Sequence, residues 1–168
     1  MILSDRDIVR EMRMNNLRII PCDIENSVQP CSIDLHLGRE LMTIHGKRID
    51  IFQDSYHLKP HEFILGGTDE YVEIPNHLCG QVDGRSSIAR LGVSVHQTGG
   101  YIDSGYCGNI TLEIYNASDK EFELSAGDSI CQMIVHLLSS ECLRPYGTHG
   151  LNSKYQDSEG VIKSKYYE

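Results

Sequence analysis

Hydrophobic positions along this chain change their period once, close to the N-terminus. Ile8 and Met12 lie one helical turn apart, and Ser4 with Asp7 has the S-x-x-D spacing of a capping box. These features predict a first helix of roughly 12 residues that begins after Ser4. Beyond this segment the helical period disappears.

From about residue 32 the chain consists of short β-type runs separated by Gly, Pro, Asn and Asp. Many short strands at this spacing predict a mainly β fold, a sandwich or barrel of the jelly-roll kind. The length of 168 residues suits one domain, and the sequence contains neither an internal repeat nor a linker, so residues 1–168 are expected to form a single domain. The runs are SIDLHL, ELMTI, EFILG, EYVEI, GVSVHQ, NITLEIYN, EFELS and ICQMIVHLL.

The run that contains Glu113 alternates cleanly between apolar and polar residues. A carboxylate in the middle of a strand is either part of a half-exposed sheet face or a functional acid, and the strand pattern alone leaves both interpretations open. The predicted inner face carries Ile110, Leu112 and Ile114, and the outer face carries Thr111, Glu113 and Tyr115.

The charge of the chain limits its partners. The sequence has 24 acidic residues against 15 lysines and arginines, for a formal net charge of -9. Such a field repels nucleic-acid phosphates, so DNA and RNA are not expected partners. A small phosphorylated ligand is compatible with this charge, because a few cations and backbone amides can hold a triphosphate within an acidic protein.

Apolar runs and cysteines indicate the cellular setting. No apolar run approaches the roughly 18 residues that span a bilayer, and the first residues, MILSDRDIVREMRMNN, lack the layout of a signal peptide. We therefore expect a cytoplasmic protein without a membrane partner. The six cysteines include no C-x-x-C pair, which argues against a structural zinc site and favours reduced thiols.

Arginine and hydroxyl side chains are concentrated between residues 84 and 90, which read GRSSIAR. Backbone amides and hydroxyls at a bend can surround phosphate oxygens, while arginine donates forked, charge-assisted hydrogen bonds. A capping turn with surface arginines is the other interpretation of this segment.

Glycines cluster between His96 and Gly108, in the segment HQTGGYIDSGYCG. Paired glycines let the backbone approach a ligand or take a positive φ, and Asp103 follows them on an expected hairpin. A glycine-rich turn with an incidental aspartate is the alternative. Asp103 precedes Glu113 by ten residues, and two carboxylates in one pocket could divide the roles of acid, base and sugar anchor.

The C-terminal segment has its own composition. The last fifteen residues contain three lysines and three tyrosines. They suit a flexible tail, at about residues 147–168, that becomes ordered over an anionic, planar ligand and closes the active site. A frayed chain end is the alternative.

Four segments of this chain are recognisable: MILSD at the start, QPCSIDLHLG at 29–38, GRSSIARLG at 84–92 and IDSGYCGNITLEIYN at 102–116. Together they resemble the dCTP deaminase family of the trimeric dUTPase superfamily, in the same order and spacing, from residue 1 to about residue 165. The resemblance implies a distorted jelly-roll or β-barrel of the dUTPase-like kind, a homotrimer, and hydrolytic deamination of dCTP in pyrimidine deoxynucleotide metabolism.

The resemblance also assigns catalytic roles. Glu113 corresponds to the glutamate that takes a proton from water and passes it to N3 and then to the leaving amino group. Arg90 and Ser86 match the residues that hold this water and the pyrimidine edge. Asp103 corresponds to the aspartate that binds the deoxyribose 3′-hydroxyl, and Tyr106 to the tyrosine that leaves no room for a 2′-hydroxyl. Family members use no zinc, and this chain lacks the H-x-E and P-C-x-x-C pattern of zinc-dependent deaminases.

A larger set of residues is implied for binding the nucleotide. Magnesium is expected on the triphosphate, held mainly by phosphate oxygens and water. dTTP is a candidate inhibitor, through an inactive conformation of the loop at Thr98. Ser158 stands where most family members have a glutamine, and Gln156 is the candidate substitute. The implied phosphate-binding residues are Arg85, Ser86, Ser87, Gln132, Lys154 and Tyr155, and the other implied substrate contacts are Thr98, Gly99, Tyr101, Tyr146 and Gln156.

The residues before Asp103 separate two subgroups of the family. Enzymes that release dUTP tend to read TAHRID, whereas bifunctional enzymes that continue to dUMP read close to HQTAGxIDxGF. This chain reads HQTGGYIDSGY, which is nearer the bifunctional pattern. Gly100 is expected to leave space near the α-phosphate for a second water, oriented by Asp103. We therefore expect dUMP and pyrophosphate as products; the alternatives are an enzyme that stops at dUTP, a dUTPase without deamination, and a catalytically silent nucleotide-binding trimer.

Overall fold

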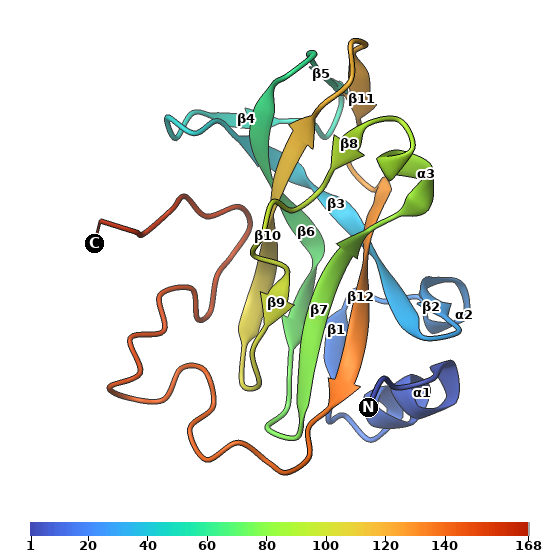
Figure 1. Cartoon of the computed structure of the whole chain (residues 1–168), viewed down its shortest axis with the longest axis vertical. Helices are drawn as coiled ribbons and strands as arrows, with labels where there is room; N and C mark the ends of the chain where they lie inside the picture. Colours follow the sequence, from blue (N-terminus) through green and yellow to red (C-terminus); the bar gives the residue numbers. More distant parts are fainter. Residues whose placement is uncertain (168) are drawn as a thin grey trace.

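A computed structural model describes residues 1–167, which are built on one curled antiparallel sheet and a separate pair of strands (Figure 1). The strands are β1 (Arg18–Ile20), β2 (Val28–Gln29), β3 (Ser32–Met42), β4 (Arg48–Asp50), β5 (Tyr56–Leu58), β6 (Phe63–Glu73), β7 (Leu78–Gly84), β8 (Val93–Ser94), β9 (Tyr101–Ile102), β10 (Cys107–Asn116), β11 (Phe122–Leu124) and β12 (Ser129–Leu137). The main path of the ten-stranded sheet is β8-β10-β6-β3-β12-β7-β9, with β1 paired to β6, and β2 and β4 paired to β3. Strands β5 and β11 form the second sheet. The predicted mainly β fold is confirmed.

Three short helices lie within the described residues: α1 (Asp5–Arg13), α2 (Ile24–Ser27) and α3 (Ser86–Ala89). α1 is the predicted first helix, shortened to nine residues. Ser4 occupies its N-cap, but within residues 1–167 the Ser4 side chain makes no capping hydrogen bond, so the predicted capping box is wrong. The N–H of Asp7 is already bonded to the Ser4 carbonyl at 3.0 Å. No helix of the described chain is long and apolar enough to cross a membrane.

Long strands with bulges replace several of the predicted short runs. SIDLHL and ELMTI together form β3, and EFILG and EYVEI form β6. The pairing register shifts between Leu37 and Leu41 in β3 and across residues 68–70 in β6. Such a bulge moves the apolar alternation to the other face, which is why one strand reads as two. Strand β7 was not predicted, because Gly80 and Gly84 interrupt its apolar pattern.

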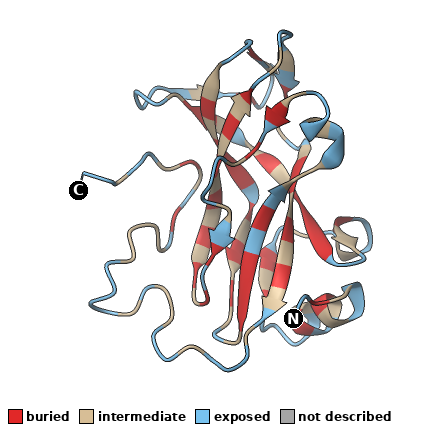
Figure 2. Ribbon diagram, in the orientation of Figure 1, coloured by how far each residue is buried: buried red, intermediate tan, exposed pale blue. Residues whose placement is uncertain are grey.

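Strand β10 shows how the core directs the outer side chains (Figure 2). Ile110, Leu112 and Ile114 are 5%, 1% and 0% exposed, while Glu113 between them is only half-buried. The predicted alternation is confirmed. Since burying one such aliphatic side chain stabilises the fold by about 1.5–3 kcal/mol, these three residues hold the strand firmly in this register. Glu113 is therefore directed away from the core.

The C-terminal tail returns along the outside of β10 (Figure 1). Residues 138–167 form neither a helix nor a named strand, but Ser158 makes an isolated parallel bridge with Gly108. The N–H of Asp157 donates to the Cys107 carbonyl at 2.9 Å, and Val161 is fully buried. The tail is thus docked on the sheet along this stretch, and it does not fray as a free end would.

Candidate active site

A pocket of ≈ 590 Å³ opens between β10, the turn that precedes it and the C-terminal tail. We call it the Glu113 pocket. Apolar side chains of β6, Phe63 and Leu65, form part of its wall. A second hollow, of ≈ 630 Å³, lies at α1 and α2, and none of its described lining residues is a predicted site residue. The predicted residues that the Glu113 pocket brings together are Gly99, Tyr101, Asp103, Tyr106, Glu113, Tyr146 and Tyr155.

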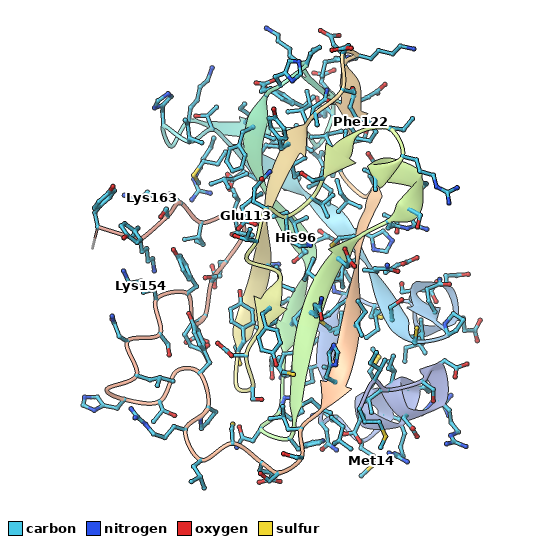
Figure 3. The ribbon with its side chains drawn as sticks, viewed as in Figure 1. Met14, His96, Glu113, Phe122, Lys154 and Lys163 are labelled. Atoms are coloured by element: carbon cyan, nitrogen blue, oxygen red, sulfur yellow. The ribbon has the colours of Figure 1, made fainter. Side chains whose placement is uncertain are left out.

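Glu113 lies near the middle of β10, opposite Leu65 of β6. Figure 3 shows its side chain beside the segment that carries His96, and the N–H of Gln97 in that segment donates to Oε2 of Glu113 at 3.4 Å. A Cβ on Gly99 would lie 3.6 Å from Oε1, so the glycine loop covers one side of the carboxylate. An ionised carboxylate accepts about four hydrogen bonds, which leaves Glu113 with capacity to bind water or substrate.

Asp103 lies in the turn between β9 and β10. Strand β9 pairs with β7, whereas β10 pairs with β6 and β8, so the chain crosses here between opposite ends of the sheet. The hairpin predicted at this point is wrong. The turn packs tightly against the tail, since a Cβ on Gly105, at φ +85°, would lie 2.5 Å from Pro145. The Asp103 side chain is exposed and lines the Glu113 pocket.

Tyr106 follows in the same turn and is only 8% exposed, yet it also lines the pocket. Its hydroxyl donates to the Asn109 carbonyl at 2.8 Å, and its ring centroid lies 5.8 Å from that of Tyr146. Burial raises the pKa of Tyr106, so the hydroxyl stays protonated and keeps this hydrogen bond. The ring is held in one position, which suits a residue that excludes substrates by shape.

Gly100 does not face open space, contrary to the expectation that its missing side chain leaves room for water. A Cβ at this position would lie 2.6 Å from the Val82 carbonyl oxygen and 3.2 Å from Cε1 of His96. The N–H of Val82 also donates to the Gly100 carbonyl at 2.6 Å. Gly100 therefore permits close packing of the loop on β7, and it is Gly99 that lines the pocket.

The predicted tail residues Lys154 and Gln156 are bonded to the protein backbone. Nζ of Lys154 donates to the Lys165 carbonyl at 2.5 Å, and Nζ of Lys165 donates to the Lys154 carbonyl at 2.7 Å. Nε2 of Gln156 donates to the Gly105 carbonyl at 2.9 Å, while the Cys107 N–H donates to Oε1 of Gln156 at 3.3 Å. The Gln156 amide thus anchors the tail to the turn before β10, and neither side chain is among the described lining of the pocket.

Ser158, which replaces the usual glutamine, has a different position. It is 6% exposed and lines the Glu113 pocket. Its hydroxyl turns back to donate to the Tyr155 carbonyl at 2.7 Å. The Tyr155 N–H in turn donates to the hydroxyl of Tyr146 at 2.9 Å, so Ser158 and these two predicted tyrosines form one connected wall.

The predicted residues on and after α3 lie apart from the Glu113 pocket. Ser86, Ser87 and Arg90 are exposed, and α3 contains no buried side chain among its described residues. Thr98 is also exposed and is not among the described lining. This surface is available to a second molecule.

Arg85 and Gln132 form a separate polar group at the ends of β7 and β12. Nη1 of Arg85 donates to the Ser129 carbonyl at 3.1 Å, and Nη2 lies 3.5 Å from Oδ2 of Asp34. Nε2 of Gln132 donates to the Gly84 carbonyl at 3.4 Å. These two predicted phosphate ligands are neighbours of α3, and they are not part of the described lining of the Glu113 pocket.

Four polar residues of the pocket were not predicted as site residues: Thr111, Ser158, Lys163 and Ser164. The alternation of β10 already puts Thr111 on the face of Glu113, so this signal could have identified it. Lys163 and Ser164 lie in a tail without periodicity, and their position depends on how the tail docks.

Magnesium, the expected metal, prefers oxygen ligands such as carboxylates, phosphates and water. Among residues 1–167 no group of three or more His, Cys, Asp and Glu side chains is arranged to hold a metal ion. The carboxylates of the pocket are Asp103 and Glu113. This set fits magnesium if the phosphate oxygens of a bound nucleotide and water supply most of the ligands.

A model of the family described as dCTP deaminase-like matches residues 2–138. The chain belongs to the dCTP deaminase-like family. A relative from Dictyoglomus thermophilum named dCTP deaminase, dUMP-forming is 40% identical, and the match covers 98% of this chain and 94% of the relative. Proteins of the same name from Halobacterium salinarum and Mycobacterium ulcerans are 39% and 37% identical, over 98% and 100% of this chain and 94% and 97% of their own lengths.

Solved structures share the fold of this member of the dCTP deaminase-like family. The 2′-deoxycytidine 5′-triphosphate deaminase of Agrobacterium tumefaciens matches with a TM-score of 0.69 at 21% identity, over 82% of this chain and 48% of the longer Agrobacterium chain. A mutant dUTPase from phage phi11 of S. aureus, which coordinates a structural Mg(II) ion, matches with a TM-score of 0.54 at 17% identity, over 76% of this chain and 94% of its own. The expected dUTPase-like fold is confirmed.

Proposed function

We propose that this chain hydrolyses dCTP in two steps, first removing the amino group of cytosine and then releasing pyrophosphate. The observation that carries this proposal is the Glu113 carboxylate, which faces a pocket also lined by Asp103 and Tyr106 in a member of the dCTP deaminase-like family. Nearly full-length relatives named dCTP deaminase, dUMP-forming support both steps. In total, dCTP and two waters yield ammonia, dUMP and pyrophosphate.

Glu113 carries protons in the first step. Its carboxylate accepts a proton from water while the water oxygen attacks C4 of cytosine, and it delivers that proton to N3. The second proton of the attacking oxygen then passes by way of Glu113 to the exocyclic nitrogen. The C4–N4 bond breaks, ammonia leaves, and C4 becomes the carbonyl of dUTP. The half-buried Glu113, beside the N–H of Gln97, is held close to where these atoms would lie.

The sugar occupies the part of the pocket at Asp103 and Tyr106. The Asp103 carboxylate accepts a hydrogen bond from the 3′-hydroxyl, and the fixed ring of Tyr106 excludes a 2′-hydroxyl. Asp103 also orients the water that attacks the α-phosphorus and displaces pyrophosphate in the second step. Because Gly100 is packed against Val82, the room for this water lies on the pocket side of Gly99.

The phosphates of the nucleotide need positively charged ligands, and the Glu113 pocket of one chain does not bring several of them together. The predicted ligands on the α3 surface, Ser86, Ser87 and Arg90, are exposed and lie outside the described lining of that pocket. In a homotrimer, α3 of a neighbouring copy would complete the pocket, with Arg90 holding the first water and the pyrimidine edge. Arg85 and Gln132, which bond to the Ser129 and Gly84 carbonyls next to this segment, are the other proposed phosphate ligands.

Magnesium bound to the triphosphate would neutralise phosphate charge and favour departure of pyrophosphate. Asp103 is the carboxylate of this chain best placed to contact its water shell. dTTP would occupy the same pocket as a competing ligand, with Thr98 in the responding loop. The chain would act in the cytoplasm on free nucleotides.

The product mixture formed from dCTP and magnesium tests this function directly. Ammonia, dUMP and pyrophosphate in equal amounts are expected. Ammonia with dUTP alone would restrict the chain to deamination, and dUMP formed only from added dUTP would make it a dUTPase. Retained dCTP binding without any turnover would identify a silent nucleotide-binding trimer and contradict the proposal.

The variant Glu113→Gln tests the assigned proton carrier. The amide preserves the shape of the side chain but accepts no proton, so ammonia release should fall by at least about 10³-fold while dCTP binding persists. Calorimetry measures the binding, and Glu123→Gln on the exposed part of β11 is a matched control. Deamination by Glu113→Gln at a rate near that of the parent would remove Glu113 from this role.

A further inference from the structure

The outer face of β10 presents a hydrogen-bond acceptor at every second residue. These acceptors are the side-chain oxygen of Asn109, the hydroxyl of Thr111 and the carboxylate of Glu113. All three side chains are half-buried on the face opposite the core. The C-terminal tail runs along this face, so its backbone meets the acceptors one after another.

Two regular contacts join the tail to this row. The N–H of Gly160 donates to Oδ1 of Asn109 at 2.9 Å, and the N–H of Ile162 donates to Oγ1 of Thr111 at 3.1 Å. Each step advances two residues on both segments. Gly160 has a φ of +65°, so the tail bends at the first contact. An extended chain after this bend repeats every two residues with a rise of about 3.3 Å per residue, so the next pair in the series is Ser164 with Glu113.

The first contact is firmly held by β6. Nδ2 of Asn109 donates to the carbonyls of Thr68, Asp69 and Glu70 at 3.0, 3.3 and 3.1 Å, in the bulge of that strand. This leaves Oδ1 of Asn109 directed at the tail. A Cβ on Gly67 would lie 3.1 Å from the Val161 nitrogen, so the tail also packs closely on the sheet between the two contacts.

Ser164 is held on both sides. Before it, the N–H of Ile162 donates to the hydroxyl of Thr111. After it, the N–H of Lys165 donates to the hydroxyl of Tyr155 at 3.0 Å. Ser164 and Glu113 both line the pocket, and Figure 3 shows the tail segment with Lys163 passing beside Glu113. The carboxylate accepts the long, 3.4 Å hydrogen bond from the N–H of Gln97 and can accept more.

We propose that Ser164 is a positioning residue whose backbone N–H donates to the Glu113 carboxylate when a nucleotide fills the pocket. This third contact extends the series from Asn109 and Thr111 to the proposed catalytic acid. A donor on one oxygen fixes the carboxylate in place and directs the other oxygen at the attacking water. The consequence for catalysis rests on the proposed deamination, whereas the contact itself requires only that a nucleotide binds in the pocket.

Proline substitution tests the catalytic consequence because it removes the backbone N–H. Ser164→Pro should lower kcat for ammonia release at least about tenfold, with KM changed less than about threefold. Tyr167→Pro, at a residue 98% exposed, is the matched control and should stay within about twofold of the parent. Ser164→Ala keeps the N–H and should lose less than Ser164→Pro. Equal losses in Ser164→Pro and either other variant would overturn the proposal, as would an unchanged kcat in Ser164→Pro.

Amide hydrogen exchange tests the contact without turnover. The probe is α,β-imido-dUTP, which has no amino group to lose and no hydrolysable bridge between the α and β phosphorus atoms. Its binding should slow exchange at the Ser164 amide at least about tenfold, to a level near those of Gly160 and Ile162. An amide of Ser164 that exchanges as fast as that of Tyr167 in the complex would contradict the contact. If the parent releases no ammonia, the proposed function fails, and the exchange result still decides this inference.

Discussion

Tyr106 is buried and also lines the Glu113 pocket, so it is the residue to test for sugar selection. Tyr106→Ala should reduce the preference for dCTP over CTP by roughly tenfold or more, because the ring would no longer fill the 2′ position. Tyr106→Phe keeps the ring, loses the hydrogen bond to the Asn109 carbonyl and should retain the preference. Competition assays with both nucleotides measure the ratio, after circular dichroism shows that each variant is folded. An unchanged ratio in folded Tyr106→Ala would mean that other residues read the sugar.

Individual residues were predictable from the sequence where a local pattern decides their direction. Glu113 is such a case, because apolar neighbours on both sides in β10 turn it outward. The positions of Gly100 and Gln156 could not be predicted, because their neighbours come from distant segments of the chain. Val82 lies against Gly100, and the Gly105 carbonyl accepts a hydrogen bond from Gln156. The sequence shows that glycine or an amide is present, but it does not show which backbone lies next to it.

At the scale of elements, Glu11 is the acid that joins α1 to the turn between β6 and β7. Its Oε2 accepts a hydrogen bond from Asn16 at 2.9 Å and lies 3.0 Å from Nε2 of His77. Burial acts to raise the pKa of Glu11, but the hydrogen bonds with Asn16 and His77 outweigh it, so the pKa lies below its ordinary value of 4.5. The ionised form therefore stabilises the fold above about pH 4.5, and this contribution is lost as the pH falls through the lower pKa of the folded chain.

Glu11→Gln should consequently be less stable than the parent by about 1–3 kcal/mol at pH 7, with a smaller difference at about pH 3.5. Urea unfolding at both pH values gives these free energies. Glu25→Gln, which changes an exposed carboxylate of α2, should match the parent within about 0.5 kcal/mol. A difference for Glu11→Gln that is the same at both pH values would show that shape, and not charge, explains its effect.

The elements themselves were predicted unevenly. Strand β10 and most of β12 were predicted correctly, because each has a continuous apolar pattern. The two 11-residue strands, β3 and β6, were each divided in two because their bulges reverse the alternation. Strands β4, β5 and β9, of two or three residues each, were not predicted, whereas the equally short β8 and β11 lie within the predicted runs GVSVHQ and EFELS.

At the scale of the whole molecule, the proposed site is divided between two surfaces of the chain, the Glu113 pocket and the exposed α3. Inactive Glu113→Gln and Arg90→Ala chains, unfolded together and refolded, should therefore regain activity in mixed trimers. About one pocket in four would receive both an intact Glu113 and an intact Arg90, because each position is filled correctly half the time. The specific activity of the mixture measures this, against each variant refolded alone. No recovery, or sedimentation as a monomer of 19.0 kDa, would contradict a shared site.

The fold and family were predictable at this scale, because the spacing of strands and the four recognised segments extend over nearly the whole chain. The way in which the site is assembled was less predictable from the sequence. Whether a tail covers its own pocket or that of a neighbour depends on how the chain turns after β12, and no period marks that turn. In the structure the tail docks on β10 of its own chain through Asn109 and Thr111.

That docking has a genetic consequence. The tail and the carboxylate it reaches are encoded in one chain, so a cell that carries one shortened and one complete copy of the gene would build mixed assemblies in which every complete chain still covers its own pocket. We expect loss of the tail to be recessive. A change that disturbs α3 would leave the same share of pockets intact, but each lost pocket would belong to the chain next to the altered one.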